Sequence, residues 1–201
     1  TVNPYIAAID NLVAYEPEFL TARIMDANGD MIAELNSREG GARDAVALTD
    51  MSPFVIHAIV STENRTFYED PGFDIGRVLS ALLDNLSSDE IVSGASTITQ
   101  QVARNLVLQD TEVTADRKLR EILVAMEISR RYDKNFILEL YLNEIFFGNQ
   151  SYGVEAASQF YFDKPASEVN MAEAALLAGL AWPAGRSEPY NSPPPPLRPI
   201  F

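Results

Sequence analysis

The sequence contains no cysteine and only one histidine, His57. The lack of cysteine excludes a disulfide scaffold, a thiol nucleophile and a Cys/His zinc site. A Ser-His-Asp triad could be built only around His57. Catalysis by this chain would therefore have to rest on carboxylates.

Positive charge and long apolar runs are scarce as well. Fifteen basic residues face 29 acidic ones, and the resulting net charge of -14 disfavours a general nucleic-acid-binding protein. The longest apolar run, Ala174 to Trp182, falls well short of the roughly 18 to 20 residues that span a bilayer. The chain as given is therefore not predicted to be transmembrane. It begins with Thr1 rather than methionine, which indicates a processed or truncated piece.

The 201 residues, 47% of them apolar, suffice for one sizeable core or two small lobes. Their charge is unevenly distributed. From Arg104 to Lys134, seven basic residues face six acidic ones, a net of +1, which leaves -15 for the rest of the chain. Such a segment is either a solvated helix with surface salt bridges or a local anion-binding site.

A small β element is predicted near the N-terminus. Short alternating runs from Thr21 to Met25 and from Met31 to Leu35 flank a turn that contains Asn28 and Gly29, and Asn-Gly is a strong hairpin signal. A continuation of this element is predicted from Ala45 to Leu48. We assign residues 1–50 to this β-containing segment and expect it to pack on a catalytic domain.

The pattern becomes helical after residue 50, and we assign residues 51–188 to the catalytic domain. Ser52 can cap, and Pro53 can start, a first helix that contains Phe54, Ile56, Ile59 and Val60. Further helices are predicted at about 74–86, 96–108, 114–131, 134–146, 151–161 and 171–181. Their expected N-caps include Ser96, Thr114 and Asp133. Residues 189–201 are rich in proline and read as a tail or linker.

Two glutamates are candidates for catalysis. Glu63 stands where an apolar helix gives way to polar residues, a place where a carboxylate can face a cleft; otherwise it is an exposed glutamate near Arg65. Glu121 has Arg117 at i-4 and Lys118 at i-3 on its own helical face. If these were ordinary surface pairs, each would be worth ~0.3 to 0.5 kcal/mol.

The run GASTITQQ at positions 94–101 gathers hydroxyl groups, amides and backbone N–H groups at one predicted helix N-terminus, which attracts phosphate. Arg104, one turn later, adds a positive charge. The alternative is a simple Ser/Thr N-cap with a polar first turn. The candidate binding residues of this run are Ser96, Thr97, Gln100 and Gln101.

Four runs stand in a fixed order over about 80 residues: ENRTF at 63–67, GASTITQQ at 94–101, RKLRE at 117–121 and KNFILELYLN at 134–143. They resemble the first four motifs of the family 51 peptidoglycan glycosyltransferases. These are the glycan-polymerising modules of class A penicillin-binding proteins and of monofunctional glycosyltransferases. The similarity extends less tightly over roughly residues 15 to 190.

The resemblance implies a mainly α, lysozyme-like fold of two lobes that polymerises lipid II into β-1,4-linked glycan strands. It places the enzyme at the outer face of the bacterial plasma membrane, held there by an N-terminal transmembrane helix that this chain does not include. The implied partners are lipid II, the nascent glycan strand, the membrane surface and cell-wall synthesis proteins, and not nucleic acid.

The resemblance also implies roles for single residues. Glu63 would be the base that deprotonates the 4-hydroxyl of the acceptor sugar, and Glu121 would lie near the pyrophosphate together with Arg117 and Lys118. Gln101 and Arg104 would contact the phosphates of the donor. A divalent metal, Mg²⁺ or Mn²⁺, is implied as an aid to catalysis without a specified ligand set, and no organic cofactor is expected.

The chemistry of the residues agrees on separate grounds. A glycosidase must protonate a poor leaving group and needs an acid beside its second carboxylate, whereas a pyrophosphate leaves as an anion. Transfer therefore needs one base and several cations, which this chain offers in Glu63 and the basic cluster. Two alternatives stay open: a lytic glycosidase of the lysozyme superfamily, and a catalytically silent module that binds glycan or lipid.

The sequence departs from the family pattern in three places. The first motif usually reads Glu-Asp and ends in His before the Gly, but Asn64 and Asp70 occupy those two places. The fifth motif is absent, because the chain runs into prolines after Asn191. No transpeptidase sequence follows. The apolar segment from Val78 to Val92 is expected either to touch the membrane or to be helical core.

Overall fold

The structure, a computed structural model, describes residues 2–15, 20–35, 41–74, 76, 96–109 and 114–181. Within these ranges the chain is mainly helical, and this confirms the predicted fold class. The α-helices are α1 (Ile6–Asp10), α2 (Pro53–Glu63), α4 (Ile98–Val102), α5 (Ala115–Arg131), α6 (Lys134–Glu144), α7 (Val154–Phe162) and α8 (Met171–Leu180). Short 3-10 turns occur at Asn3–Tyr5, Asn11–Ala14, Leu48–Asp50 and Ala166–Glu168, and a π-helical turn at Ala103–Leu108.

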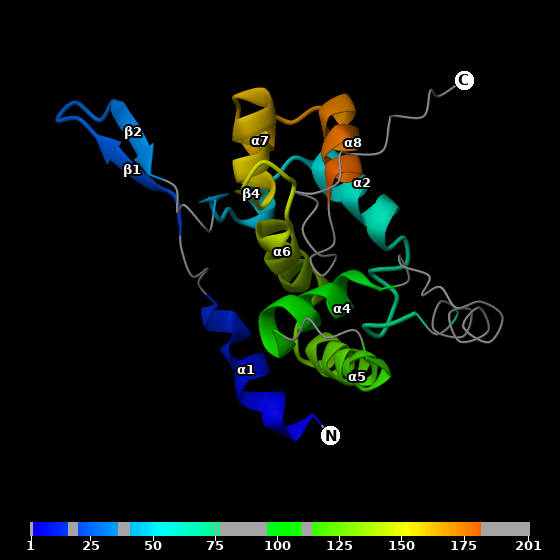
Figure 1. Cartoon of the computed structure of the whole chain (residues 1–201). Coiled ribbons are helices and arrows are strands. Elements are labelled where there is room, and N and C mark those ends of the chain that lie inside the picture. The colour runs from blue at the N-terminus through cyan, green and yellow to red at the C-terminus, as the bar shows by residue number, and fades with distance from the viewer. Residues whose placement is uncertain are drawn as a thin grey trace.

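The predicted hairpin is confirmed. Strands β1 (Ala22–Met25) and β2 (Met31–Leu35) pair antiparallel. The carboxylate of Asp26 organises the turn between them, because its Oδ1 accepts from the backbone N–H groups of Asn28 and Asp30, both at 2.8 Å. These backbone hydrogen bonds also lower the pKa of Asp26. The hairpin projects from the body of the molecule, and every residue of β1 is exposed (Figure 1).

The strand predicted at Ala45–Leu48 is wrong. The side-chain amide of Asn143 takes both backbone groups of Val46, accepting from its N–H at 3.0 Å and donating to its C=O at 2.9 Å, so a neighbouring strand cannot use them. The strand lies earlier, at β3 (Ala42–Arg43), and pairs in parallel with β4 (Ser151–Tyr152).

The pairing of β4 also corrects two helix boundaries. Helix α6 ends at Glu144 rather than at 146, because Phe146 forms a bridge to Tyr152. The next helix begins at Val154 rather than at 151, after Gly153 with a φ of +80°. An added Cβ at that glycine would lie 2.7 Å from the carbonyl oxygen of Asn143, so the close approach requires glycine.

The N-terminal segment is helical where only β structure was predicted. Residues 3–14 form α1 and its flanking 3-10 turns, and Ile9 and Leu12 enter the hydrophobic core. The hydroxyl of Tyr132 donates to the carbonyl of Ile9 at 2.7 Å. This helix is too short to show a helical period in the sequence, and its packing against the end of α5 stabilises it.

Three predicted N-caps are confirmed: Ser52, Thr114 and Asp133 each accept from a backbone N–H in the first turn of their helix. The fourth is wrong, since Thr97 and not Ser96 caps α4. Thr97 Oγ1 accepts from the N–H of Gln100 at 3.1 Å, and the side chain of Gln100 accepts from the N–H of Thr97 at 2.8 Å. This reciprocal pair is a capping box.

The helices form two groups joined by α6 (Figure 1). Helix α2 packs against α8 in one group, and α4 packs against α5 and α6 in the other. One continuous core of buried apolar side chains runs through both groups. Within the described ranges, no helix combines the length and the apolar character needed to cross a bilayer.

Several sequence predictions lie outside the described residues. These are most of the helix at 74–86, the segment Val78–Val92, and the proline-rich tail at 189–201. The assignment of domains stays a prediction.

Candidate functional site

The buried face of α5 changes character along the helix. Its buried residues recur at three- and four-residue spacing, as on one side of a helix: Arg117, Glu121, Val124, Ala125 and Ile128. The C-terminal part of this face is apolar and joins the core. The N-terminal part carries a guanidinium and a carboxylate into the same interior.

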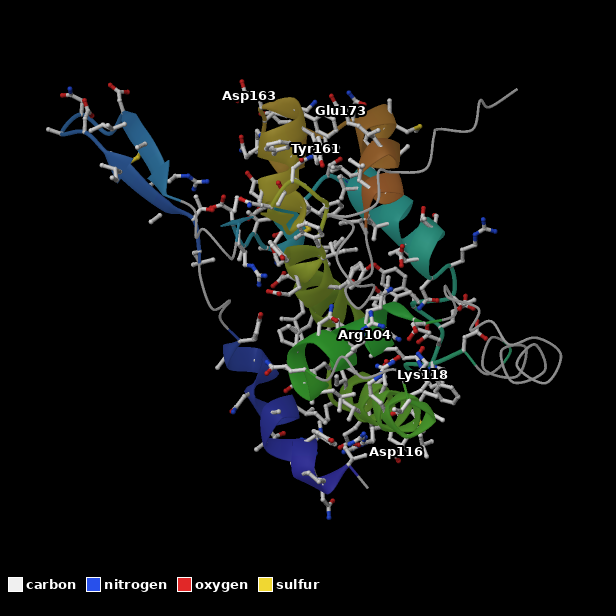
Figure 2. All side chains as sticks on the ribbon, in the orientation of Figure 1. Arg104, Asp116, Lys118, Tyr161, Asp163 and Glu173 are labelled. Atoms are coloured by element: carbon white, nitrogen blue, oxygen red, sulfur yellow. The ribbon has the colours of Figure 1, made fainter. Side chains whose placement is uncertain are left out.

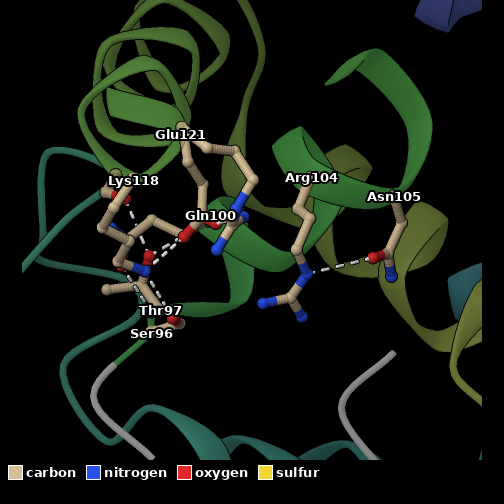
Figure 3. A network of polar contacts seen from close by, with 9 residues as sticks. Ser96, Thr97, Gln100, Arg104, Asn105, Lys118 and Glu121 are labelled. Carbon is tan, nitrogen blue, oxygen red and sulfur yellow. Dashed lines mark hydrogen bonds and ion pairs between the residues drawn. The ribbon is translucent and has the colours of Figure 1, made fainter. Parts of the chain in front are cut away.

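Glu121 is fully buried and bonded to two cations. Its Oε2 accepts from Arg117 Nη1 at 2.7 Å, and its Oε1 accepts from the ammonium of Lys118. The same ammonium donates to Ser96 Oγ at 2.6 Å, which ties α5 to the residue before α4 (Figure 3). The spacing read from the sequence is therefore confirmed, but the surface character of the pairs is not, because no part of the carboxylate reaches solvent.

Arg104 brings a third cation to this cluster. It lies in the π-helical turn that continues α4, and its Nε donates to Asn105 Oδ1 at 3.4 Å (Figure 3). Burial lowers the pKa of Arg104, as does the charge of Arg117, while Glu121 opposes the shift. Burial, with the charges of Arg104 and Arg117, also lowers the pKa of Lys118. The charge of Arg117 thus acts on both Arg104 and Lys118.

The cluster has more positive charge than its one carboxylate can balance. Three cations, Arg104, Arg117 and Lys118, surround Glu121, so the group carries a net charge of +2. Positive charge held away from water is costly unless an anion compensates it. Among the carboxylates of the described residues, Glu121 is the one whose charge acts on Lys118.

Buried donors without partners occur in the same place. Among the described residues, Gln100 Nε2, Arg104 Nη2 and Arg117 Nε are buried and have no hydrogen-bond acceptor. A buried polar group normally has a partner, because leaving it without one costs about 1 to 3 kcal/mol. Three such donors around one surplus of positive charge indicate a site for an anionic ligand.

Glu63, the last residue of α2, lies on the other side of Gln101. The amide Nε2 of Gln101 donates to Glu63 Oε2 at 2.9 Å. The amide oxygen Oε1 of Gln101 accepts from the hydroxyl of Tyr141 at 3.5 Å. Burial raises the pKa of Tyr141 well above 10, the charge of Glu63 adds to the shift, and Arg104 opposes it. Tyr141 therefore lies within electrostatic reach of both Glu63 and the cationic cluster.

Comparison with known proteins gives one consistent result. The family model described as transglycosylase matches residues 28–196 of this chain. The chain belongs to the transglycosylase family. It is 40% identical over 172 residues to penicillin-binding protein 1A of Aquifex aeolicus, which covers 86% of this chain and 23% of that protein.

Two further relatives agree. Penicillin-binding protein 2D of Bacillus subtilis is 44% identical over 165 residues (82% of this chain, 23% of the relative), and penicillin-binding protein 1A of Pseudomonas aeruginosa is 36% identical over 190 residues (94% and 22%). The chain thus spans less than a quarter of the length of these relatives. The resemblance found in the motifs is confirmed.

The transglycosylase motifs meet at the α4–α5 end of the molecule, where Figure 2 labels Arg104 and Lys118. Six of the nine predicted site residues are joined by hydrogen bonds or ion pairs, in one group around Glu63 and another around Glu121: Glu63, Gln101, Ser96, Lys118, Glu121 and Arg117. Arg104 interacts electrostatically with Glu121. The side chains of Thr97 and Gln100 form the hydrogen bonds of the capping box, and Thr97 Oγ1 also donates to the carbonyl of Gly72 at 2.7 Å. The roles of all nine residues toward substrate stay predictions.

The described residues do not offer a metal site built by protein side chains. No group of three or more His, Cys, Asp or Glu side chains suited to hold a metal ion occurs in the described part of the chain. Both oxygens of Glu121 already accept from cations, and an amide, Asn64, stands where the family usually has a carboxylate.

Two features of the site were missed in the sequence. Tyr141 lies within the fourth motif, and nothing in a linear pattern shows that its hydroxyl faces Gln101. Asn64 and Asp70 were identified only as departures from the family pattern. The structure brings them together, since Asn64 Nδ2 donates to Asp70 Oδ2 at 2.7 Å.

Proposed function

We propose that this chain is a peptidoglycan glycosyltransferase that joins lipid II units into β-1,4-linked glycan with release of polyprenyl pyrophosphate. The proposal rests above all on one observation: three partly or fully buried cations surround the buried Glu121, and Gln101, three residues before Arg104, donates to the carboxylate of Glu63. A base beside an anion-binding site is what displacement of a pyrophosphate requires.

The reaction is a single displacement. The carboxylate of Glu63 takes the proton from the 4-hydroxyl of the acceptor sugar as that oxygen attacks C1 of the donor. The bond between C1 and the phosphate oxygen breaks, and its electron pair leaves with the pyrophosphate. Attack from the face opposite the leaving group converts the α configuration at C1 into a β linkage.

The cationic cluster stabilises the charge that develops on the leaving group. Arg104, Arg117 and Lys118 are held in place before the substrate arrives, so little reorganisation is needed during the reaction. The unpartnered N–H groups of Arg104 and Arg117 supply donors for phosphate oxygens. Glu121 keeps two of the cations in place, because it bonds to both Arg117 and Lys118.

The same arrangement does not favour glycoside hydrolysis. A glycosidase needs a carboxylic acid that can protonate the leaving sugar oxygen. Both oxygens of Glu121 accept hydrogen bonds from cationic donors, which leaves neither to donate a proton. Glu63 would then have to serve as the acid.

We place the reaction at the outer face of the bacterial plasma membrane, where lipid II and the nascent glycan strand are the partners. Any Mg²⁺ or Mn²⁺ that takes part would be bound through oxygens of the pyrophosphate, since the described residues offer no ligand set of their own.

The test is to incubate the chain with lipid II and to measure the length of the glycan product. Polymer formed by the wild type and lost in Glu63→Gln supports the proposal. Release of soluble sugar from purified peptidoglycan in the absence of lipid II would instead identify a lytic glycosidase. Tight binding of lipid II without product, at any concentration of Mg²⁺ or Mn²⁺, would identify a silent binding module.

A further inference from the structure

The loop that follows Glu63 is fixed by one buried carboxylate. Asp70 accepts three hydrogen bonds: from Asn64 Nδ2 at 2.7 Å, from the backbone N–H of Gly72 at 2.8 Å, and from Lys134 Nζ at 3.0 Å. Its side chain is only 4% exposed, and Asn64 is fully buried. A carboxylate so placed is stable only with such partners, so the three contacts hold one another in place.

The loop is also packed firmly. Phe67 is fully buried, and the ammonium of Lys134 lies 4.7 Å from the centre of its ring. The backbone closes on itself, because the N–H of Phe67 donates to the carbonyl of Asn64 at 3.0 Å and the N–H of Asp70 donates to that of Thr66 at 2.9 Å. The segment from Asn64 to Gly72 is therefore a spacer of fixed shape.

The far end of this spacer is attached to α4 and lies against α5, the helix that carries Arg117, Lys118 and Glu121. The carbonyl of Gly72 accepts from Thr97 Oγ1, the N-cap of α4, at 2.7 Å. The φ of Gly72 is +101°, and an added Cβ would lie 2.5 Å from the carbonyl oxygen of Ala125, one turn beyond Glu121 on α5. Figure 1 shows the chain leaving α2 and running toward α4 and α5.

The near end of the spacer is Glu63 itself. Helix α2 ends there, because the next residue, Asn64, has an extended backbone with φ at -156° and ψ at 86°. Asn64 turns its side chain inward to Asp70. The hydrogen bond between these two residues therefore sets where the last turn of α2, and with it the carboxylate of Glu63, stands relative to Glu121.

We propose that Asn64, Asp70 and Lys134 are positioning residues that fix Glu63 relative to the pyrophosphate-binding cations, with Asn64 and Asp70 forming a complementary pair of donor and acceptor. The donor is at 64 and the acceptor at 70. The opposite order would be complementary as well, whereas two carboxylates or two amides at these positions would not be. This inference rests on the proposed function, since it assigns Glu63 as the base.

Exchange of the two side chains tests the pairing. Asn64→Asp places a second carboxylate against Asp70, and the repulsion should move the end of α2. Because a displacement of about 1 Å can cost a hundredfold in rate, we expect kcat to fall by about that factor while the affinity for lipid II changes little. The double variant Asn64→Asp with Asp70→Asn restores one carboxylate, one amide and one ammonium. Its kcat should return to within about tenfold of the wild type.

The pH profile separates positioning from general loss of structure. In Asn64→Asp two carboxyl groups in contact cannot both ionise freely, so protonation of one at lower pH should restore part of kcat. The wild type and the double variant should show no such gain. Glu69→Gln is the matched control, because this neighbouring carboxylate of the same loop is exposed and should leave both kcat and the profile unchanged.

Thermal unfolding of the wild type, Asn64→Asp, Asp70→Asn and the double variant gives a readout that does not need activity. The unfolding temperature should fall in each of the two single variants and recover in the double variant. If the wild type polymerises lipid II and Asn64→Asp does so equally well, the inference fails while the proposed function stands. If the wild type does not polymerise lipid II, the proposed function fails. If the losses in unfolding temperature of the two single variants add up in the double variant without recovery, the pairing of Asn64 with Asp70 is wrong.

Discussion

Replacing Lys118 by alanine should separate catalysis from stability. The ammonium of Lys118 bonds to Glu121 and Ser96, yet its side chain is 36% exposed and two other cations repel it. In Lys118→Ala, loss of the favourable contacts lowers the free energy of unfolding, whereas relief of the repulsion raises it. We therefore expect the free energy of unfolding to change by less than about 1 kcal/mol, which shifts the melting temperature of a domain of this size by roughly 2 to 4 °C at most.

The effect on turnover should be much larger. A unit charge about 4 Å from a phosphate oxygen is worth roughly 4 kcal/mol at an effective dielectric constant near 20. Removing one preorganised contact to a developing anion typically costs about 2.7 to 4 kcal/mol of barrier, or a hundredfold to a thousandfold in rate. Lys118→Ala should thus fold normally and polymerise lipid II at about 1% of the wild-type rate or less.

The assay is the initial rate of glycan formation from lipid II, measured beside thermal unfolding of the same preparation. Arg130→Ala is the matched control, since Arg130 lies on the same helix but pairs with Glu127 at the surface. This control should change neither readout. Normal polymerisation by Lys118→Ala, with a slightly lower melting temperature, would refute the idea that the cations of α5 act on the leaving group.

Three further predictions follow from the same geometry. Glu63→Gln should bind lipid II and polymerise it ~100 to 10,000 times more slowly, whereas Glu69→Gln should change the rate of polymerisation only slightly. Near-normal polymerisation by Glu63→Gln would mean that Glu63 is not the base, and Glu121 would be tested next. Glu121→Gln should destabilise the chain by about 3 to 5 kcal/mol, seen as an earlier transition in urea, because three cations lose their buried counter-charge. Since burial lowers the pKa of Lys118, kcat/KM should decline with rising pH before the ordinary lysine value of 10.5 is reached, and Lys118→Arg should move this decline to higher pH. An unchanged alkaline limb in Lys118→Arg would argue that another group titrates there.

The sequence was informative where the determinant is local. The hairpin follows from Asp26 and the Asn-Gly turn, whose hydrogen bonds span four residues. The starts of α2, α5 and α6 follow from Ser52, Thr114 and Asp133, because a capping side chain needs to reach only its own first turn.

Errors arose where a distant residue competes for the same backbone. The strand predicted at Ala45–Leu48 fails because Asn143, far along the chain, bonds to both backbone groups of Val46. Similarly, Thr97 rather than Ser96 caps α4, while Lys118 uses the hydroxyl of Ser96. Such contacts leave no trace in a window of neighbouring residues.

The sequence by itself determined which side chains the protein has for chemistry: one candidate base, a basic cluster around Glu121, and motifs that identify the family. Only the tertiary structure decided that Glu121 is buried and not a surface partner. The i-4 and i-3 spacing is the same in both cases, and exposure depends on what packs over that face of α5. The structure likewise joined Glu63 to Gln101 and Asn64 to Asp70. Hydrogen bonds of this kind depend on the direction of side chains in space, and a linear pattern of residues does not contain that direction.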